Sequence, residues 1–304
     1  MPETPQVDDT AASRRALVVP AVWAVLSALA VAGCYLVFVR TAWGQELDDL
    51  AFEGRHAVTS AATRRTDRLL GVVTEGSLFF LGGAVVLVGV AQWRIRVAFV
   101  AGCCMCGAVL TTELLKLRLL TRPSFRGVQG FTDNSFPSGH ATIGIVLALG
   151  LVMVAPPRLR RMATVLAAFT AAAFGTAVLA SGWHRPSDTI GAYGVAMCWF
   201  CAGHFVLLRG DRRRTLGRGR RHIDRPTSRP VVLVAGVAVL GFLVFALWRS
   251  VGYAGLRTVA YARLYVLACV AIDVIGVVVV FAFALRTGDR TRARVRRSGG
   301  NLVS

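Results

Sequence analysis

The sequence predicts an all-α protein, a polytopic membrane helical bundle, and two observations carry this prediction. Of the 304 residues, 55% are hydrophobic, whereas soluble domains are usually about 45–50% apolar. The apolar residues also gather in blocks of about 17–25 residues, the length that a helix needs to cross a bilayer core. Only helices satisfy all their backbone hydrogen bonds within such a block, so the blocks should be α-helical.

Eight blocks are expected to be spans, and they divide the chain into two parts. Residues 1–208 would hold a six-helix core, and residues 231–304 a two-helix C-terminal hairpin with a basic tail. Nine arginines crowd the segment between them, 209–230, which is therefore expected to be a basic cytoplasmic linker. The eight predicted spans are 16–39, 70–91, 97–115, 141–155, 163–182, 188–208, 231–249 and 264–285.

The formal net charge of +19 is explained by membrane topology. In a soluble protein it would suggest nucleic acid, but cytoplasmic loops of membrane proteins are enriched in Lys and Arg. With a cytoplasmic N-terminus, 22 of the 35 basic residues would lie inside and 13 outside. We therefore expect a multi-pass protein of the cell membrane with both termini cytoplasmic, membrane lipids as partners and no nucleic acid. No feature indicates the oligomeric state.

Three polar stretches lie at span ends, all on the outer side in this topology. The first contains Lys116 and Arg122, two cations that could reach one anion from two sides. Arginine offers a flat fork of donors that matches phosphate, and lysine offers a compact charge. Basic residues also flank spans in general, which is the alternative explanation. Glu113, one turn earlier, is expected to pair with Lys116 or with Arg118.

The second stretch, Phe136-Pro137-Ser138-Gly139-His140, directly precedes the fourth span. A helix N-terminus presents unpaired N–H groups and a positive dipole, so it can hold an anion. Ser138 can cap the helix or donate to phosphate, and Gly139 permits close backbone approach. His140 can exchange a proton near neutral pH. Ordinary capping of the helix is the alternative.

The third stretch, Ser181-Gly182-Trp183-His184-Arg185-Pro186-Ser187-Asp188, opens the sixth span. A spacing of four residues would place His184 and Asp188 on one side of a helical turn. A carboxylate that accepts from one imidazole nitrogen leaves the other nitrogen free as a base or nucleophile. A simple helix start accounts for the proline and serine, but it leaves the histidine unexplained.

In this order and on one membrane face, the three stretches resemble the motifs of the type 2 phosphatidic acid phosphatase superfamily. The six-span core of that family would match residues 16–208, so the predicted core is phosphatase-like. The segment 40–69, which opens RTAWGQELDDLAFEG, is also similar to the first outer loop of bacterial members.

The resemblance implies a role for each matched residue. His184 would be the nucleophile and form a phosphohistidine, Asp188 would orient it, and His140 would protonate the departing group. The phosphoryl oxygens would be held by Lys116, Arg122, Ser138 and the Gly139 amide. Phosphoryl transfer depends chiefly on positioning and on stabilised charge, so the resemblance implies a phosphoric monoester or diphosphate hydrolase that needs no metal and no other cofactor.

Two departures from the family pattern concern the phosphate-binding cations. Only five residues separate Lys116 from Arg122, where the family usually has six. Val178 stands where the family's third motif usually carries an arginine. Arg185 or Arg126 would be the replacement cation, and Arg185, next to the predicted nucleophile, is the substrate-binding candidate.

The sequence therefore predicts a membrane phosphatase that hydrolyses a lipid phosphate or diphosphate at the extracytoplasmic face. Candidate substrates are an isoprenyl diphosphate, phosphatidic acid and phosphatidylglycerol phosphate. Two alternatives remain open. A lipid phosphotransferase would use the same site with another acceptor. A catalytically degenerate protein that binds lipid phosphates would account for Val178.

Overall fold

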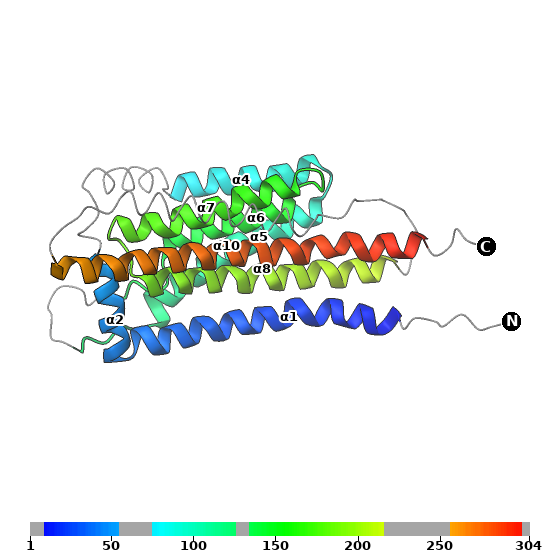
Figure 1. Cartoon of the computed structure of the whole chain (residues 1–304). Helices are drawn as coiled ribbons and strands as arrows, with labels where there is room; N and C mark the ends of the chain where they lie inside the picture. The colour runs from blue at the N-terminus through cyan, green and yellow to red at the C-terminus, as the bar shows by residue number, and fades with distance from the viewer. Residues whose placement is uncertain (1–8, 55–74, 126–133, 216–255, 300–304) are drawn as a thin grey trace.

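The computed structural model describes residues 9–54, 75–125, 134–215 and 256–299, which form helices and no strand. Figure 1 shows these helices side by side in one elongated bundle. The predicted all-α, multi-pass fold class is thus confirmed.

The described helices have the following order and bounds along the chain. They are α1 (Asp9–Cys34) with its π-helical extension η1 (Tyr35–Val39), α2 (Ala42–Glu53), α4 (Glu75–Ala91), α5 (Ile95–Leu114) with its π-helical extension η3 (Leu115–Leu119), α6 (Gly139–Val154), α7 (Arg160–Ala180), α8 (Pro186–Thr215) and α10 (Leu256–Gly299). The short helix α2 is the element that the hydropathy pattern did not predict.

Five of the described helices are long and apolar enough to cross a membrane. They contain the segments Leu17–Val39, Ile95–Leu119, Arg160–Ala180, Pro186–Gly210 and Arg263–Leu285. Two shorter apolar helices, Phe80–Ala91 and Gly139–Val154, lie among them. Together these seven segments correspond to seven of the eight predicted spans. The remaining one, 231–249, lies outside the described residues, as does most of the predicted linker, although α8 continues to Thr215.

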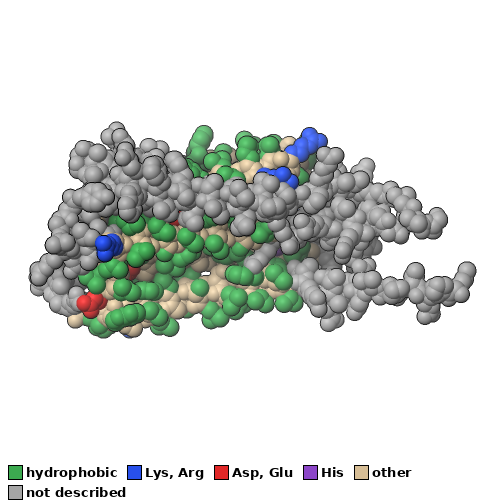
Figure 2. Space-filling model, viewed as in Figure 1, with side chains coloured by type: hydrophobic (Ala, Val, Ile, Leu, Met, Phe, Trp, Pro, Cys, Tyr) green, Lys and Arg blue, Asp and Glu red, His purple; other side chains and the backbone are tan. Residues whose placement is uncertain are grey.

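Helix α6 lies at the centre of the bundle. Most of its side chains are buried, and it packs against α4, α5, α7, α8 and α10. Small residues of α7 such as Ala167, Ala171 and Ala172 are fully buried, which lets neighbouring helix backbones approach closely, as is typical within membranes. Large apolar side chains cover the outside instead (Figure 2), for example Phe80 and Phe99, which are 77% and 69% exposed.

Helix α10 is part of the same core. It packs along α7 and α8 and also contacts α2. Its side chains Tyr265, Cys269 and Ile272 are buried in the hydrophobic cluster that α5 to α8 form.

One end of the bundle collects the polar stretches. The first residues of α1 and the last residues of α10 lie at one end, and α2 lies at the other (Figure 1). The start of α8 is at the α2 end, because Asp48 of α2 accepts a hydrogen bond from the Ser187 amide. The start of α6 is there too, because the Ser138 amide donates to the Asp188 carbonyl.

Candidate active site

The three predicted motifs meet where α6 and α8 begin. The Ser138 amide donates to the Asp188 carbonyl at 3.0 Å, which joins the second motif to the third. The first motif reaches the same place, since a Cβ added to Gly139 would lie 3.7 Å from Lys116 Nζ. The structure therefore places residues from three separate segments around one helix start.

A tight turn brings His184 to this place. Gly182 has a φ of 68°, a left-handed conformation that glycine adopts without steric cost. The turn lets the Trp183 and His184 amides donate back to the Val178 carbonyl at 3.2 and 3.3 Å. Pro186 then begins α8, a first-turn position where its missing N–H costs nothing.

His184 and Asp188 form the predicted pair. His184 Nδ1 lies 3.3 Å from Asp188 Oδ2, and that carboxylate oxygen also accepts from the Arg185 amide at 3.0 Å. Asp188 is fully buried, whereas the His184 side chain keeps 13% of its exposure. A proton held on Nδ1 by the carboxylate leaves Nε2 with its lone pair, which is the state that a nucleophile requires.

His140, the second residue of α6, lies beside this pair. The centroids of the His140 and His184 rings are 6.4 Å apart. A single phosphoryl group can bridge that distance, because a reacting contact is about 3–3.5 Å long. Trp183 meets the His140 ring edge-on with centroids 4.9 Å apart, and this contact orients the imidazole.

Ser138 acts as the cap of α6. Its Oγ accepts from the Ala141 amide at 3.2 Å, and the residue is fully buried. The hydroxyl proton can still be donated, so the predicted contact with phosphate remains a prediction. Gly139 has no side chain to cover the first turn of the helix, and its amide is one of the first-turn N–H groups that have no acceptor within the helix.

Lys116 pairs with Glu113, as the sequence predicts. Lys116 Nζ lies 2.8 Å from Glu113 Oε1, and the side chains are 21% and 40% exposed. The same carboxylate oxygen lies 2.8 Å from the position that a Cβ at Gly139 would take. Glu113 thus lies beside both the lysine and the first turn of α6, which are the groups expected to hold phosphate.

Asn134 holds the Lys116 stretch in place. Its side-chain amide donates to the carbonyls of Lys116, Leu120 and Phe136 at 3.2, 3.2 and 3.0 Å. These bonds join the π-helical turn η3 to the loop before α6. Sequence reasoning missed this residue, because an asparagine in a loop carries no signal of such distant partners.

Arg122 lies on the α2 side of the site. Its Nη2 is 3.4 Å from Asp48 Oδ2, and its buried Nη1 has no hydrogen-bond partner among the described residues. Burial and the neighbouring Arg185 lower the pKa of Arg122, while Asp188 and the two carboxylates of α2 raise it. The guanidinium stays charged despite these opposing influences on its pKa. Its Nη1 is a donor that has no acceptor among the described residues.

Arg185 also turns toward α2. Its Nε donates to Asp49 Oδ1, and its guanidinium lies 5.6 Å from the centroid of the Phe52 ring. Val178 is fully buried, and Arg126 lies outside the described residues. A phosphate contact by Arg185 therefore remains a prediction, which would require the arginine to serve α2 and the substrate together.

The site offers fixed positive groups, and no set of metal ligands was found in the part of the chain that the structure describes. Within those residues, no group of three or more His, Cys, Asp or Glu side chains is placed to hold a metal ion. Lys116, Arg122 and the start of α6 supply positive potential beside the imidazoles.

Comparison with known proteins agrees with this geometry. Residues 97–214 match the model of the PAP2 superfamily, and the match includes all three motifs and nearly all of the helices α5 to α8. No curated protein and no solved structure matches the chain. Residues 97–214 supply both imidazoles and the Asp188 carboxylate, and this segment is similar to the PAP2 superfamily, the family that the three motifs resemble.

Proposed function

We propose that this protein is a membrane phosphatase that hydrolyses a lipid phosphate or diphosphate through a phosphohistidine on His184. The observation that supports it best is the pair of imidazoles with ring centroids 6.4 Å apart, one of them bonded to the buried carboxylate of Asp188. Basic residues beside a membrane span are common, whereas two facing histidines at paired helix starts are not explained by packing.

In the first step, His184 Nε2 attacks the phosphorus atom. A nitrogen–phosphorus bond forms, the bond from phosphorus to the lipid oxygen breaks, and His140 gives its proton to that oxygen. Asp188 accepts the Nδ1 proton of His184 in a hydrogen bond and stabilises the positive charge that develops on the ring.

In the second step, water attacks the phosphohistidine. His140, now neutral, takes a proton from the water, the nitrogen–phosphorus bond breaks, and inorganic phosphate leaves. Both imidazoles return to their starting states, so the cycle balances. Lys116, Arg122 and the Gly139 amide stabilise charge on the phosphoryl oxygens in both steps.

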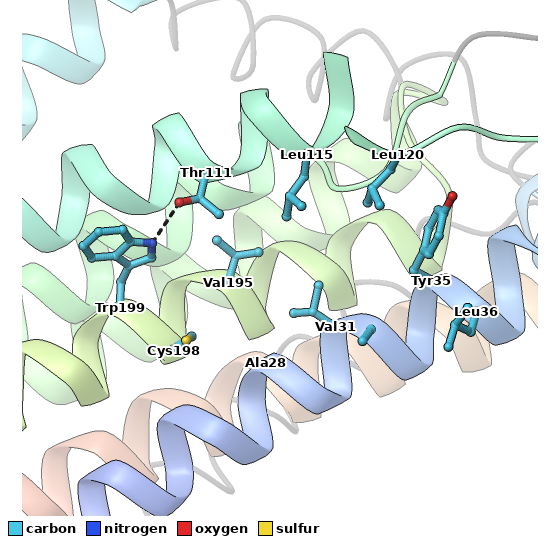
Figure 3. Close-up of a pocket in the computed structure, with 11 residues that line it drawn as sticks. Ala28, Val31, Tyr35, Leu36, Thr111, Leu115, Leu120, Val195, Cys198 and Trp199 are labelled. Carbon is cyan, nitrogen blue, oxygen red and sulfur yellow. Dashed lines mark hydrogen bonds between the residues drawn. The ribbon is translucent and has the colours of Figure 1, made fainter. Parts of the chain in front are cut away.

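An apolar groove between α1, α5 and α8 supports a lipid as the substrate (Figure 3). Its volume of about 390 Å³ falls within the range of small-molecule sites, about 300–1,000 Å³. One end lies at Tyr35 and Leu120, next to the stretch that carries Arg122, and Trp199 lies at the other end. The polar groups of Tyr35 and Trp199 already bond to Thr121 and Thr111, so the groove suits a hydrocarbon chain.

The proposed orientation places the site at the extracytoplasmic face. The site lies at the α2 end of the bundle. The first residues of α1 and the last residues of α10 lie at the opposite end (Figure 1). The charge bias along the sequence favours a cytoplasmic location for that opposite end.

The test is phosphate release by the purified protein in detergent, without added metal. The panel contains an isoprenyl diphosphate, phosphatidic acid and phosphatidylglycerol phosphate, and the control is His184→Ala. Wild type should release phosphate and yield an acid-labile phosphohistidine, and the variant should do neither. Full activity in the variant would refute the assignment of His184. Tight binding of orthovanadate without turnover of any substrate would favour a degenerate binding protein, and a phosphorylated acceptor in place of free phosphate would favour a transferase.

The groove is tested by filling it from α1. Ala32 lines it and is exposed, so Ala32→Trp should raise KM for long-chain substrates and leave a short-chain analogue unaffected. Ala30 is also exposed on α1 but does not line the groove, which makes Ala30→Trp the matched control. Equal effects of the two variants on long-chain substrates would show that the tail binds elsewhere.

A further inference from the structure

We propose that Asp48 of α2 is a positioning residue of the phosphatase site, which holds Arg122 and the first turn of α8 in register with each other. This inference rests on the proposed function, since its effect is on the groups that bind and attack phosphate. No motif contains Asp48, and it lies outside residues 97–214, which match the family.

The contacts of Asp48 reach two motifs at once. Its Oδ1 accepts from the Ser187 amide at 3.0 Å, and its Oδ2 accepts from the Ser187 hydroxyl at 2.6 Å. The same Oδ2 lies 3.4 Å from Arg122 Nη2. The carboxylate is 2% exposed and the arginine side chain 4%. One buried side chain therefore connects the cation of the first motif to the helix start of the third.

Helix α2 is itself fixed against the same stretch. Gln45 donates through Nε2 to the carbonyls of Val39 and Pro123, both at 2.8 Å, so the helix is bonded to the residue that follows Arg122. The Thr41 hydroxyl caps α2 by accepting from the Gly44 amide at 3.0 Å. Asp48 thus follows directly after a first helical turn that is held by both Thr41 and Gln45.

Charge explains why a carboxylate is needed at this position. Three acidic side chains, Asp188, Asp48 and Asp49, raise the pKa of Arg122, and Asp49 already accepts from Arg185. Asp48 takes the Arg122 contact, which leaves the Asp188 carboxylate to His184. If Asp48 lost its charge, Asp188 would be the strongest remaining counter-charge for the buried guanidinium, ahead of Asp49. Arg122 would then compete with His184 for the carboxylate that orients the nucleophile.

The substitution Asp48→Asn separates the two roles. The amide oxygen still accepts from the Ser187 amide and caps α8, whereas the charged oxygen that faces Arg122 and the Ser187 hydroxyl is replaced by an NH2 group, which can only donate. We expect kcat/KM for a soluble short-chain lipid phosphate to fall by about tenfold or more, as when a group that orients a catalytic side chain is removed. The matched control is Glu46→Gln, which removes one exposed carboxylate of α2 and should leave kcat/KM unchanged.

A double-mutant cycle with Arg122→Gln distinguishes positioning from a general loss of structure. If Asp48 acts through Arg122, Asp48→Asn should cost little in the Arg122→Gln background, although it costs about tenfold in wild type. Equal costs in the two backgrounds, or wild-type kinetics of Asp48→Asn, would overturn the proposal. The melting temperature of each variant in detergent shows whether it is folded.

Two further measurements keep the test decisive. Should Asp48→Asn fail to fold, Ser187→Ala removes only the 2.6 Å hydroxyl bond, and it should lower kcat/KM by about threefold; no change would count against the proposal. If wild type hydrolyses no lipid phosphate, the proposed function fails. The role of Asp48 is then read from the rise in melting temperature that orthovanadate produces, which should be smaller in Asp48→Asn than in wild type.

Discussion

The starts of α6 and α8 lie side by side and each carries one imidazole, but they are built in different ways. Helix α6 is capped by the residue that precedes it, since Ser138 Oγ accepts from the Ala141 amide at 3.2 Å. Helix α8 is capped from another part of the chain, since Asp48 accepts from the Ser187 amide across 139 residues of sequence. The start of α6 is thus encoded locally, and that of α8 depends on the packing of α2.

This difference matches the demands on the two histidines. A general acid, the role proposed for His140, needs to reach the leaving oxygen with its proton. A nucleophile needs its ring fixed, its tautomer set and its phosphoryl partner aligned within a fraction of an ångström. The start that carries the proposed nucleophile is held by a distant residue, Asp48, and by two nearby groups, the Asp188 carboxylate and the Val178 carbonyl.

The largest expected effect comes from replacing each of the two histidines, because the proposed mechanism gives them different chemical roles. His184→Ala should abolish phosphate release from every substrate, by about a thousandfold or more, because no phosphohistidine can form. His140→Ala should lower kcat/KM, which reports formation of the phosphohistidine, about 10²–10⁴-fold for lipid alcohols but much less for p-nitrophenyl phosphate, whose leaving group needs no proton. Rates with both substrates, measured for both variants, check this. If His140→Ala lost the same factor in kcat/KM on both substrates, His140 would not be the acid that protonates the leaving group.

The next effect concerns the anion site at the start of α6. Glu113 pairs with Lys116 and lies beside Gly139, so the incoming phosphate must displace or repel it. Because the pair is partly exposed and screened by water, Glu113→Gln should lower KM by only about threefold. Initial-rate kinetics at fixed ionic strength measure the change. A higher KM would show that Glu113 instead holds Lys116 in its productive position.

A smaller effect tests the local cap directly. Ser138→Ala removes the side chain that accepts from the Ala141 amide, and loss of such a cap typically costs about 1 kcal/mol. The melting temperature in detergent should fall, and by a similar amount at pH 5 and pH 8, because the serine does not titrate. A loss that changed strongly between these pH values would indicate that Ser138 is coupled to a charged neighbour.

The smallest expected effect concerns Asp48, which caps α8 from a distant part of the chain. Its contribution to the stability of the fold should depend on pH. Burial, and then the Asp188 carboxylate, raise the pKa of Asp48 to about 7, from about 3.9 in unfolded chains. The folded protein then binds a proton that the unfolded chain has lost, so this contribution to stability is full below about pH 4 and is lost as the pH rises through about 7. Asp48→Asn lacks this dependence.

The measurement is the melting temperature of Asp48→Asn minus that of wild type, which should become more positive from pH 5 to pH 8. A difference that falls or stays constant over this range would contradict the raised pKa. In the proposed site, the charged form of Asp48 is the one that positions Arg122 and also the one that burial disfavours. Such a conflict between stability and activity is common at functional sites.

Much of the fold could be predicted because hydropathy and helix signals are local. The predicted spans 16–39 and 264–285 correspond to Leu17–Val39 and Arg263–Leu285, within a residue or two. Helix α2 was missed because its pattern is mixed and acidic, and its stability comes from contacts with α8, α10 and the Arg122 stretch. A short helix of this kind depends on tertiary packing more than on its own sequence.

Much of the candidate site could also be predicted, with clear gaps. The spacing of His184 and Asp188 predicted their pair, and the position of Glu113 predicted its bond to Lys116; both are present. The carboxylates that hold Arg122 and Arg185 could not be assigned from the sequence. Their spacing of many tens of residues leaves no periodic signal, and the 40–69 segment, which contains these carboxylates, was only similar to an outer loop of the family.

The sequence by itself determined the helical membrane class, the three motifs and the pairing of residues three or four apart, because each of these depends on neighbours along the chain. Only the tertiary structure decided that Asp48 caps α8 and that Thr176 donates to the buried Asp273 at 2.6 Å. It also decided that Arg185 donates to Asp49. The physical reason is that a buried charge takes whichever counter-charge or hydrogen-bond donor the packed helices bring to it, and that partner is set by the fold.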